Sequence, residues 1–272
     1  MALKLGTSIY TYLWDMNVHD ALKRVAGFGF KYIEIMSTPP HVYVLDTDQK
    51  ARAALRKVLE DNKLQLISMN PSYGSNINLA ATIPEIRDFG VNLIQETIKL
   101  THDIGGQMVI VVPGHLHPLM PAPFETAWGW SRDSIKRCAE TAEKYGVTIA
   151  LENVTAFRFF DSVSLMLRMV DEVGSERVRL MYDVANTPPT EYAPAALHRI
   201  RDYLVFMHLS DRSNGWGHLP IGMGIIDFGA VAKSLEMIDY QGVCVLEMTH
   251  PQASDGSILA SAAKLESLGW KR

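Results

Sequence analysis

Eight short apolar runs, separated by longer stretches with helical periodicity, constrain the fold of this chain more than any other feature. The runs span residues 3–9, 32–36, 64–69, 107–112, 147–152, 178–183, 203–209 and 242–247. They are rich in Val, Ile and Leu and do not alternate cleanly with polar residues. This composition is typical of parallel strands that are covered on their outer face.

Amphipathic stretches fill most of the intervals between these runs. Across residues 84–105 the apolar residues recur at helical spacing, namely Ile86, Phe89, Leu93, Leu100 and Ile104. Helices are also predicted over 17–28, 46–62, 125–145, 160–173 and 256–268. Gly146 and the Gly105–Gly106 pair stand just before the next apolar runs, where glycine commonly ends a helix.

Strands and helices that alternate in this way over about 250 residues predict a (β/α)8 TIM barrel. No Pro/Ser-rich linker interrupts the alternation, so we expect a single domain over residues 1–272. The main alternative is a doubly wound open sheet, which often carries a glycine-rich phosphate-binding loop after its first strand. The first strand is followed here by TSIYTYLW, which contains no such loop.

Composition and charge exclude several classes of partner. The 272 residues are 47% hydrophobic, enough for a large core, and the net charge of −4 argues against a nucleic-acid partner. Cys138 and Cys244 fall in a predicted helix and strand, so no disulfide framework is visible. The start has no signal-peptide layout, and no apolar run reaches the roughly 18 residues needed to cross a membrane. We therefore expect a soluble cytoplasmic protein.

Polar residues stand at the ends of most strands, and in a barrel these ends meet on the face that carries the active site. They are Glu34, Asn70, His115, His117, Glu152, Asp183, His208 and Glu247. Any one alone has an ordinary explanation, such as a helix cap or an ion pair. Four consecutive strands that end in Glu, Asp, His and Glu are harder to explain, since three crowded carboxylates repel strongly without a cation. An oxygen-rich set with one imidazole suits Mn²⁺, our preferred ion, or Mg²⁺ or Co²⁺.

The same residues carry a resemblance to a known family. ALEN with Glu152, MYDVAN with Asp183, MHLSD with His208 and LEMT with Glu247 resemble the metal-binding signature of the xylose isomerase-like barrel superfamily. The segment HLPIGMGIIDF, residues 218–228, is similar to the superfamily's substrate loop. Its members include sugar isomerases, ketose 3-epimerases, inosose and dehydroshikimate dehydratases, and AP endonucleases. The resemblance implies one divalent cation, held by Glu152, Asp183, His208 and Glu247.

The resemblance also implies that Glu152 and Glu247 move protons, and barrel geometry allows this independently. Adjacent strands of an eight-stranded barrel are about 45° apart around the axis, so strands five and eight face each other across roughly 135°. Two carboxylates so placed can reach opposite faces of a flat enediolate, while the cation stabilises its negative charge. We predict an isomerase or epimerase of a small ketose or sugar-acid derivative, with a carbohydrate as its substrate.

Three departures from the ketose epimerases bear on the substrate. Their Asp-x-x-His motif reads Asp183-Val-Ala-Asn186 here, and Asn186 can donate a hydrogen bond but cannot act as an acid. Arg158 stands where a second glutamate often occurs, and would favour an anionic group unless it forms a surface ion pair. His218 matches a position often held by arginine. Together with His115, these three residues are the candidate substrate contacts.

Other functions remain open at this point. A lyase of the same superfamily would begin with the same proton abstraction, whether it is an inosose- or dehydroshikimate-type dehydratase or an enzyme that carries out β-elimination from a 3-keto sugar derivative. A binding or regulatory protein could also have kept the barrel. A trinuclear DNA-repair site is disfavoured, because the aspartate expected two residues before His218 is missing. Aromatic residues after the first strand, Tyr10, Tyr12 and Trp14, could stack on a sugar or form a homo-oligomer interface.

Overall fold

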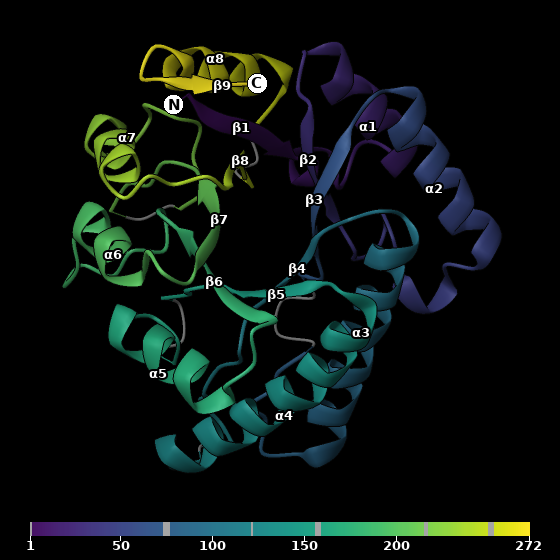
Figure 1. Cartoon of the computed structure of the whole chain (residues 1–272), viewed down its shortest axis with the longest axis vertical. Helices are drawn as coiled ribbons and strands as arrows, with labels where there is room; N and C mark the ends of the chain where they lie inside the picture. The colour runs from purple at the N-terminus through teal and green to yellow at the C-terminus, as the bar shows by residue number, and fades with distance from the viewer. Residues whose placement is uncertain (1, 73–76, 121, 156–158, 215–216, 250–252) are drawn as a thin grey trace.

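The computed structural model describes residues 2–72, 77–120, 122–155, 159–214, 217–249 and 253–272, which form a closed barrel (Figure 1). Its parallel strands are β1 (Leu3–Ser8), β2 (Tyr32–Met36), β3 (Gln65–Asn70), β4 (Met108–Val111), β5 (Thr148–Leu151), β6 (Val178–Asp183), β7 (Leu204–Leu209) and β8 (Val243–Leu246). Each strand pairs with the next along the chain, and β1 closes the ring by pairing with both β2 and β8. The predicted TIM barrel is therefore confirmed.

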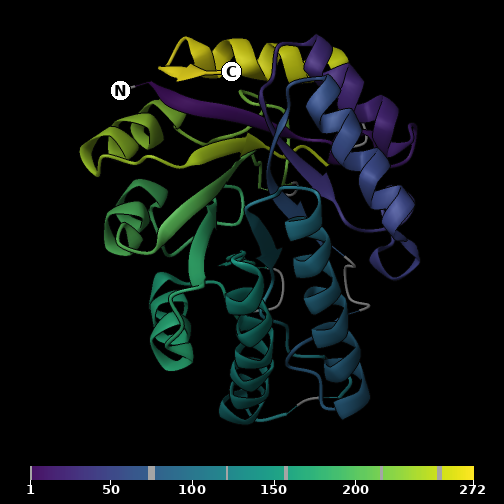
Figure 2. The same cartoon turned by 45° about the vertical axis from the view of Figure 1, so that its right-hand side comes forward.

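Eight helices surround the barrel in the described part of the chain. They are α1 (Val18–Gly27), α2 (Gln49–Asp61), α3 (Pro84–Asp103), α4 (Phe124–Tyr145), α5 (Val163–Val173), α6 (Ala193–Ile200), α7 (Phe228–Met237) and α8 (Asp255–Glu266). The long helices α3 and α4 lie side by side (Figures 1 and 2). Asn17, Asp48 and Ser162 cap α1, α2 and α5 by accepting backbone N–H bonds. Gly146 ends α4 with a φ of +69°, in the left-handed region.

The sequence did not predict three of these elements. Helix α6 has eight residues, too few to show a helical period, and small and apolar residues occupy most of α7. The two-residue strand β9 (Trp270–Lys271) pairs with β1 beside the barrel. Neither α6, α7 nor any other described helix combines the length and the apolar character that a bilayer crossing requires.

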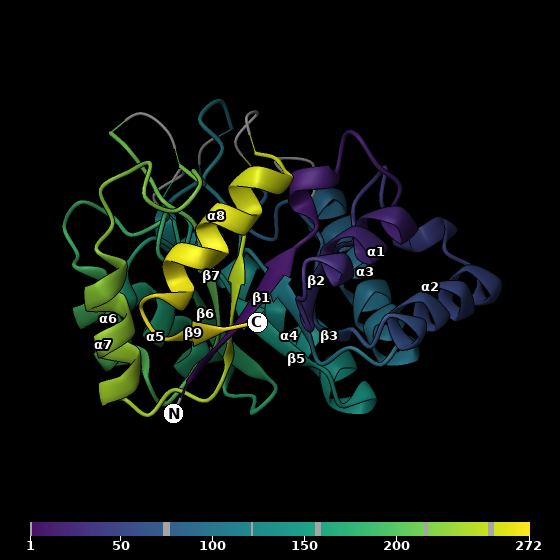
Figure 3. The same cartoon turned by 90° about the horizontal axis from the view of Figure 1, so that it is seen from above.

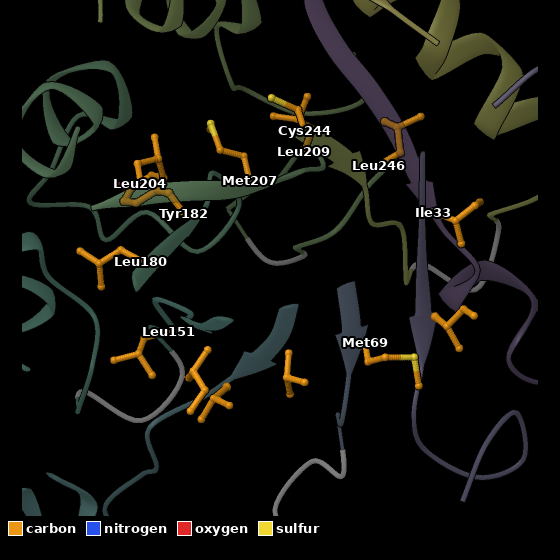
Figure 4. Packing of buried hydrophobic residues seen from close by; sticks show 14 of the residues in the cluster. Ile33, Met69, Leu151, Leu180, Tyr182, Leu204, Met207, Leu209, Cys244 and Leu246 are labelled. Atoms are coloured by element: carbon orange, nitrogen blue, oxygen red, sulfur yellow. The ribbon is translucent and has the colours of Figure 1, made fainter. Parts of the chain in front are cut away.

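The strands bury two separate layers of apolar side chains, because successive residues of a strand face opposite sides. One layer lies between the barrel and the helices, and Figure 4 shows several of its members, among them Leu180, Met207 and Leu246. The other fills the barrel interior and consists of Ile67, Met108, Ile110, Ala150, Met181, Phe206, Val243 and Val245. The barrel interior is thus filled by packed apolar side chains, as is usual for this fold.

The candidate site lies next to this interior apolar layer, at the carboxyl ends of the strands. At the ends of four strands, a candidate metal ligand stands two positions after an interior apolar residue, and therefore faces the same way. The four pairs are Ala150 and Glu152, Met181 and Asp183, Phe206 and His208, and Val245 and Glu247. In Figure 3, the purple strand β1 runs from the N-terminus toward the rim where connecting loops gather. The alternation of the strands therefore brings four polar side chains into one inner layer.

Candidate metal centre

Three carboxylates and one imidazole meet at the carboxyl ends of β5 to β8. Glu152, Asp183, His208 and Glu247 each offer one ligand atom, and these four atoms all lie within 4.8 Å of one another. Asp183 and His208 are fully buried within their strands, and the two glutamates directly follow β5 and β8. The arrangement is compact enough for a single divalent cation to contact all four side chains.

The Asp183 carboxylate is held in place by neighbours on both sides. The backbone N–H of Ala185 donates to Oδ1 at 2.8 Å, and Asn186 Nδ2 donates to Oδ2 at 2.9 Å. The side chain of Asn153 exchanges two hydrogen bonds with the backbone of Asp183, at 2.8 and 3.0 Å. Both the strand end and the carboxylate are therefore fixed before any ligand arrives.

The two ring nitrogens of His208 have different surroundings. Nε2 lies 3.0 Å from Oε2 of the buried Glu34, which also accepts a 2.8 Å hydrogen bond from Ser68 Oγ. Nδ1 makes no hydrogen bond to any residue that the structure describes, and lies 3.3 Å from Glu247 Oε2 and 3.6 Å from Glu152 Oε1. A buried nitrogen that faces two carboxylates while the other nitrogen is anchored by a third fits a metal-ligating histidine. The residues present therefore suit a divalent cation.

The pKa values of three side chains in this cluster are shifted from their usual values. Burial raises the pKa of Glu247 to about 8, although His208 and His218 partly oppose the shift. Burial likewise raises the pKa of Glu152. Burial alone would lower the pKa of His208, but the carboxylates of Glu247 and Glu34 outweigh it, and the pKa is raised well above its usual value. In the metal-free protein the cluster therefore retains protons near neutral pH, and a cation must displace them.

A cavity of about 370 Å³ opens directly above the cluster. Glu152 and Glu247 line it, whereas Asp183 and His208 lie beneath and have no exposed surface. Residues from several other strand ends and loops complete the wall, among them Tyr10, Asn70, Ile77, His115, Val154, Asn186, His218 and Thr249. Of the four clustered side chains, only the two glutamates can therefore contact a small molecule bound in this cavity.

Three of the four expected substrate contacts line this cavity. They are His115, Asn186 and His218. The Nδ1 atom of His218 lies 3.4 Å from Glu247 Oε2 and 3.6 Å from Asp183 Oδ2. The fourth, Arg158, lies outside the described residues. The structure therefore brings three of these side chains to the rim of the cluster of candidate metal ligands.

Glu34 and Asn70 stand at predicted strand ends, but the sequence alone assigns them no role. Glu34 has no exposed surface and contacts His208, and Asn70 Nδ2 donates to Glu247 Oε1 at 3.3 Å. A usable signal existed, because Glu34 interrupts the apolar run YIEIM. A charged residue in the middle of a buried strand requires a polar partner.

Replacing Glu34 by Gln should weaken metal binding about 10- to 100-fold, the usual cost of losing the partner of a metal-ligating histidine. The carboxylate fixes the ring of His208 and makes its free nitrogen more basic, and an amide does this less well. Competition with a fluorescent chelator measures the affinity. Glu60→Gln, which changes an exposed carboxylate on α2, is the matched control. An unchanged affinity in folded Glu34→Gln protein would contradict this role.

Comparison with known proteins adds four findings. A family model described as Xylose isomerase-like TIM barrel matches residues 22–268. The sequence is 24% identical over 245 residues to L-ribulose-5-phosphate 3-epimerase UlaE of Escherichia coli, covering 89% of this chain and 85% of that protein. It is 26% identical over 269 residues to D-psicose 3-epimerase of Enterocloster bolteae, covering 94% and 84%. The crystal structure of a D-tagatose 3-epimerase-like protein, 21% identical, shares the fold with a TM-score of 0.86 over 98% of this chain and 97% of that one.

Proposed function

The chain belongs to the xylose isomerase-like TIM barrel family, and from this premise we propose that it is a divalent-metal-dependent epimerase or isomerase of a small ketose or sugar-acid derivative. One observation carries the proposal. Of the four clustered side chains, Glu152 and Glu247 line the cavity while Asp183 and His208 lie below it. Two carboxylates at the cavity wall are placed to exchange protons with a bound substrate. The 3-epimerase relatives favour inversion at a carbon next to the carbonyl.

Glu247 is the proposed first base and Glu152 its partner. Glu247 takes the proton from the carbon next to the substrate carbonyl, and the electron pair of that C–H bond forms the enediolate. Glu152, which carries a proton at the start, then gives it to the opposite face of the same carbon, or to the neighbouring carbon in an isomerisation that also moves a proton between the two substrate oxygens. Proton exchange with solvent afterwards restores both carboxyl groups. Asn70 orients the base, because its Nδ2 donates to Glu247 Oε1.

The proposed cofactor is one divalent cation held by Glu152, Asp183, His208 and Glu247. When bound, it would supply positive charge that stabilises the negative charge developing on the substrate oxygens. Mn²⁺ is preferred, with Mg²⁺ and Co²⁺ as alternatives, because the ligand set is rich in carboxylate oxygen. A doubly charged ion is also favoured because it would offset the repulsion among the three buried carboxylates.

The remaining cavity residues support a polar, small substrate. His115, Asn186 and His218 offer hydrogen bonds to hydroxyl groups at the rim of the cluster. The lining contains no lysine or arginine among the described residues. Recognition of a phosphate or carboxylate would therefore depend on Arg158, whose contact with substrate stays a prediction from the sequence.

The proposal is tested by incubating the Mn²⁺-loaded protein with ketopentoses, ketohexoses and their phosphates in D₂O. We expect one substrate to give its epimer or isomer with deuterium at the reacting carbon, as followed by NMR. A lyase would instead produce a conjugated enone or enol that absorbs in the near ultraviolet. That product would replace the proposal by the lyase alternative, and failure to bind any of these metals or to turn over any sugar would refute both.

A further inference from the structure

A buried carboxylate outside the metal cluster organises the loop that follows β7. Asp211 is 1% exposed, and its two oxygens accept four backbone hydrogen bonds. Oδ1 accepts from the N–H groups of Arg212 at 2.9 Å and Ile226 at 3.1 Å. Oδ2 accepts from Gly222 at 2.8 Å and Gly224 at 2.9 Å. Both ends of the loop thus meet at one side chain. Hydrogen bonds to a carboxylate are stronger than those between neutral groups.

The two glycines explain how the backbone can wrap around this carboxylate. Gly222 has a φ of +85°, a conformation that residues with a side chain rarely adopt. A Cβ atom on Gly224 would collide with Asp211 Oδ1 and with the backbone carbonyl of Arg212. The Gly-x-Gly sequence of the loop is therefore matched to the buried carboxylate.

The same residue also anchors the segment that carries His218. The backbones of Asp211 and Leu219 exchange two 2.8 Å hydrogen bonds. His218, next to Leu219, has a φ of +54° and its carbonyl accepts from the N–H of Thr249 at 3.3 Å. These contacts hold the backbone of His218 beside the cavity, and the ring Nδ1 lies 3.2 Å from Ser210 Oγ and 3.4 Å from Glu247 Oε2. A shift of the loop would therefore move His218 relative to the reacting groups.

We propose that Asp211 is a positioning residue, whose carboxylate acts as an internal anion that shapes the described loop residues 212–214 and 217–226 and so holds His218 against Glu247. The expected effect on catalysis rests on the proposed function, whereas the expected effect on the loop structure does not. Asp211 does not line the cavity, and the hydrogen bonds that its carboxylate accepts come from none of the four candidate metal ligands. Its effect on catalysis therefore passes through the loop.

Asp211→Asn is a sharp test, because it preserves the shape of the side chain. Each oxygen accepts two N–H groups, so an amide NH₂ on either side would face two donors. We expect faster hydrogen exchange at the amides of Gly222 and Gly224, an unchanged metal content, and kcat/KM reduced about 10- to 100-fold by the misplaced loop. Asp227→Asn, which changes the cap of α7 at the end of the same loop, should leave all three unchanged.

A double-variant cycle separates positioning from a merely structural role. If Asp211 acts through His218, Asp211→Asn should cost little further activity once His218→Ala is present. Independent losses that multiply would overturn the proposal, and so would loss of metal in Asp211→Asn. Gly224→Ala disturbs the same contact from the loop side and should reproduce both the exchange and the kinetic results. Failure of both Asp211→Asn and Gly224→Ala to fold would also contradict it, since a local role leaves the barrel intact.

The two proposals fail in different ways. Exchange and metal content are measured without substrate, so a protein that epimerises no sugar would refute the proposed function and leave the loop result standing. An active enzyme whose Asp211→Asn variant exchanges and turns over normally would refute the positioning role alone.

Discussion

Glu247→Gln and Glu152→Gln should each lower turnover by about 10²–10⁴-fold, the range typical of losing a general acid or base. Glutamine keeps the size of the side chain and one oxygen that can contact a cation, but it cannot accept a proton. Metal binding should therefore weaken only partly. Turnover is measured at saturating Mn²⁺, and metal content is determined for each variant, with Glu60→Gln on α2 as the exposed control.

The two glutamate variants should also differ from each other. A substrate deuterated at the reacting carbon should still exchange its label with solvent in the variant that keeps the first base. We expect this exchange in Glu152→Gln and its absence in Glu247→Gln, as followed by NMR. The reverse pattern would exchange the two roles. Near-normal turnover by either fully metallated variant would rule out the mechanism with two glutamates.

Metal removal should abolish activity and return of Mn²⁺ should restore it. Asp183→Ala or His208→Ala should lose most of the bound ion, because each removes one of four ligands that lie within 4.8 Å of one another. Elemental analysis of never-chelated protein should find about one divalent ion per chain, as one four-ligand site requires. Asp61→Ala, which removes an exposed carboxylate on α2, should retain it. A folded, active protein without metal would show that the cluster is structural.

Metal affinity should also depend on pH in a defined direction. The pKa of Glu247 is raised to about 8 and that of His208 is raised as well, so the metal-free cluster holds protons that a cation must displace. Lowering the pH below about 8 should therefore weaken binding, by about tenfold per pH unit for each proton displaced. Calorimetry in buffers of different ionisation enthalpy measures the protons released. Binding that is independent of pH between 6 and 8 would contradict this coupling.

The fold and the inner face of the candidate metal centre follow from patterns that the sequence displays directly. The strand period of two places Glu152, Asp183, His208 and Glu247 beyond residues that face the interior, so their meeting follows from the barrel alone. Loop side chains obey no such period. Of the aromatic residues after β1, Tyr10 lines the cavity, whereas Tyr12 is buried and donates its hydroxyl to Asp255 at 2.6 Å.

Supporting residues were harder to predict than ligands, because their roles depend on contacts between segments far apart in the chain. Glu34 and His208 are 174 residues apart in sequence, yet they share a 3.0 Å contact. Asp211 stands within the MHLSD segment, but its four backbone partners become apparent only once the following loop has folded back. Local propensity cannot supply such pairings, which arise from tertiary packing.

The alternation of inward and outward residues determines which positions of this barrel can be changed by engineering and which cannot. Deleting one residue between Ala150 and Glu152, or between Val245 and Glu247, would turn a carboxylate from the interior toward the surrounding helices. Cavity residues such as Tyr10, His115 and His218 follow the strands in the connecting segments. Insertions and exchanges there leave the spacing within the strands intact. Libraries aimed at new sugars should therefore randomise the rim and keep the length of every strand.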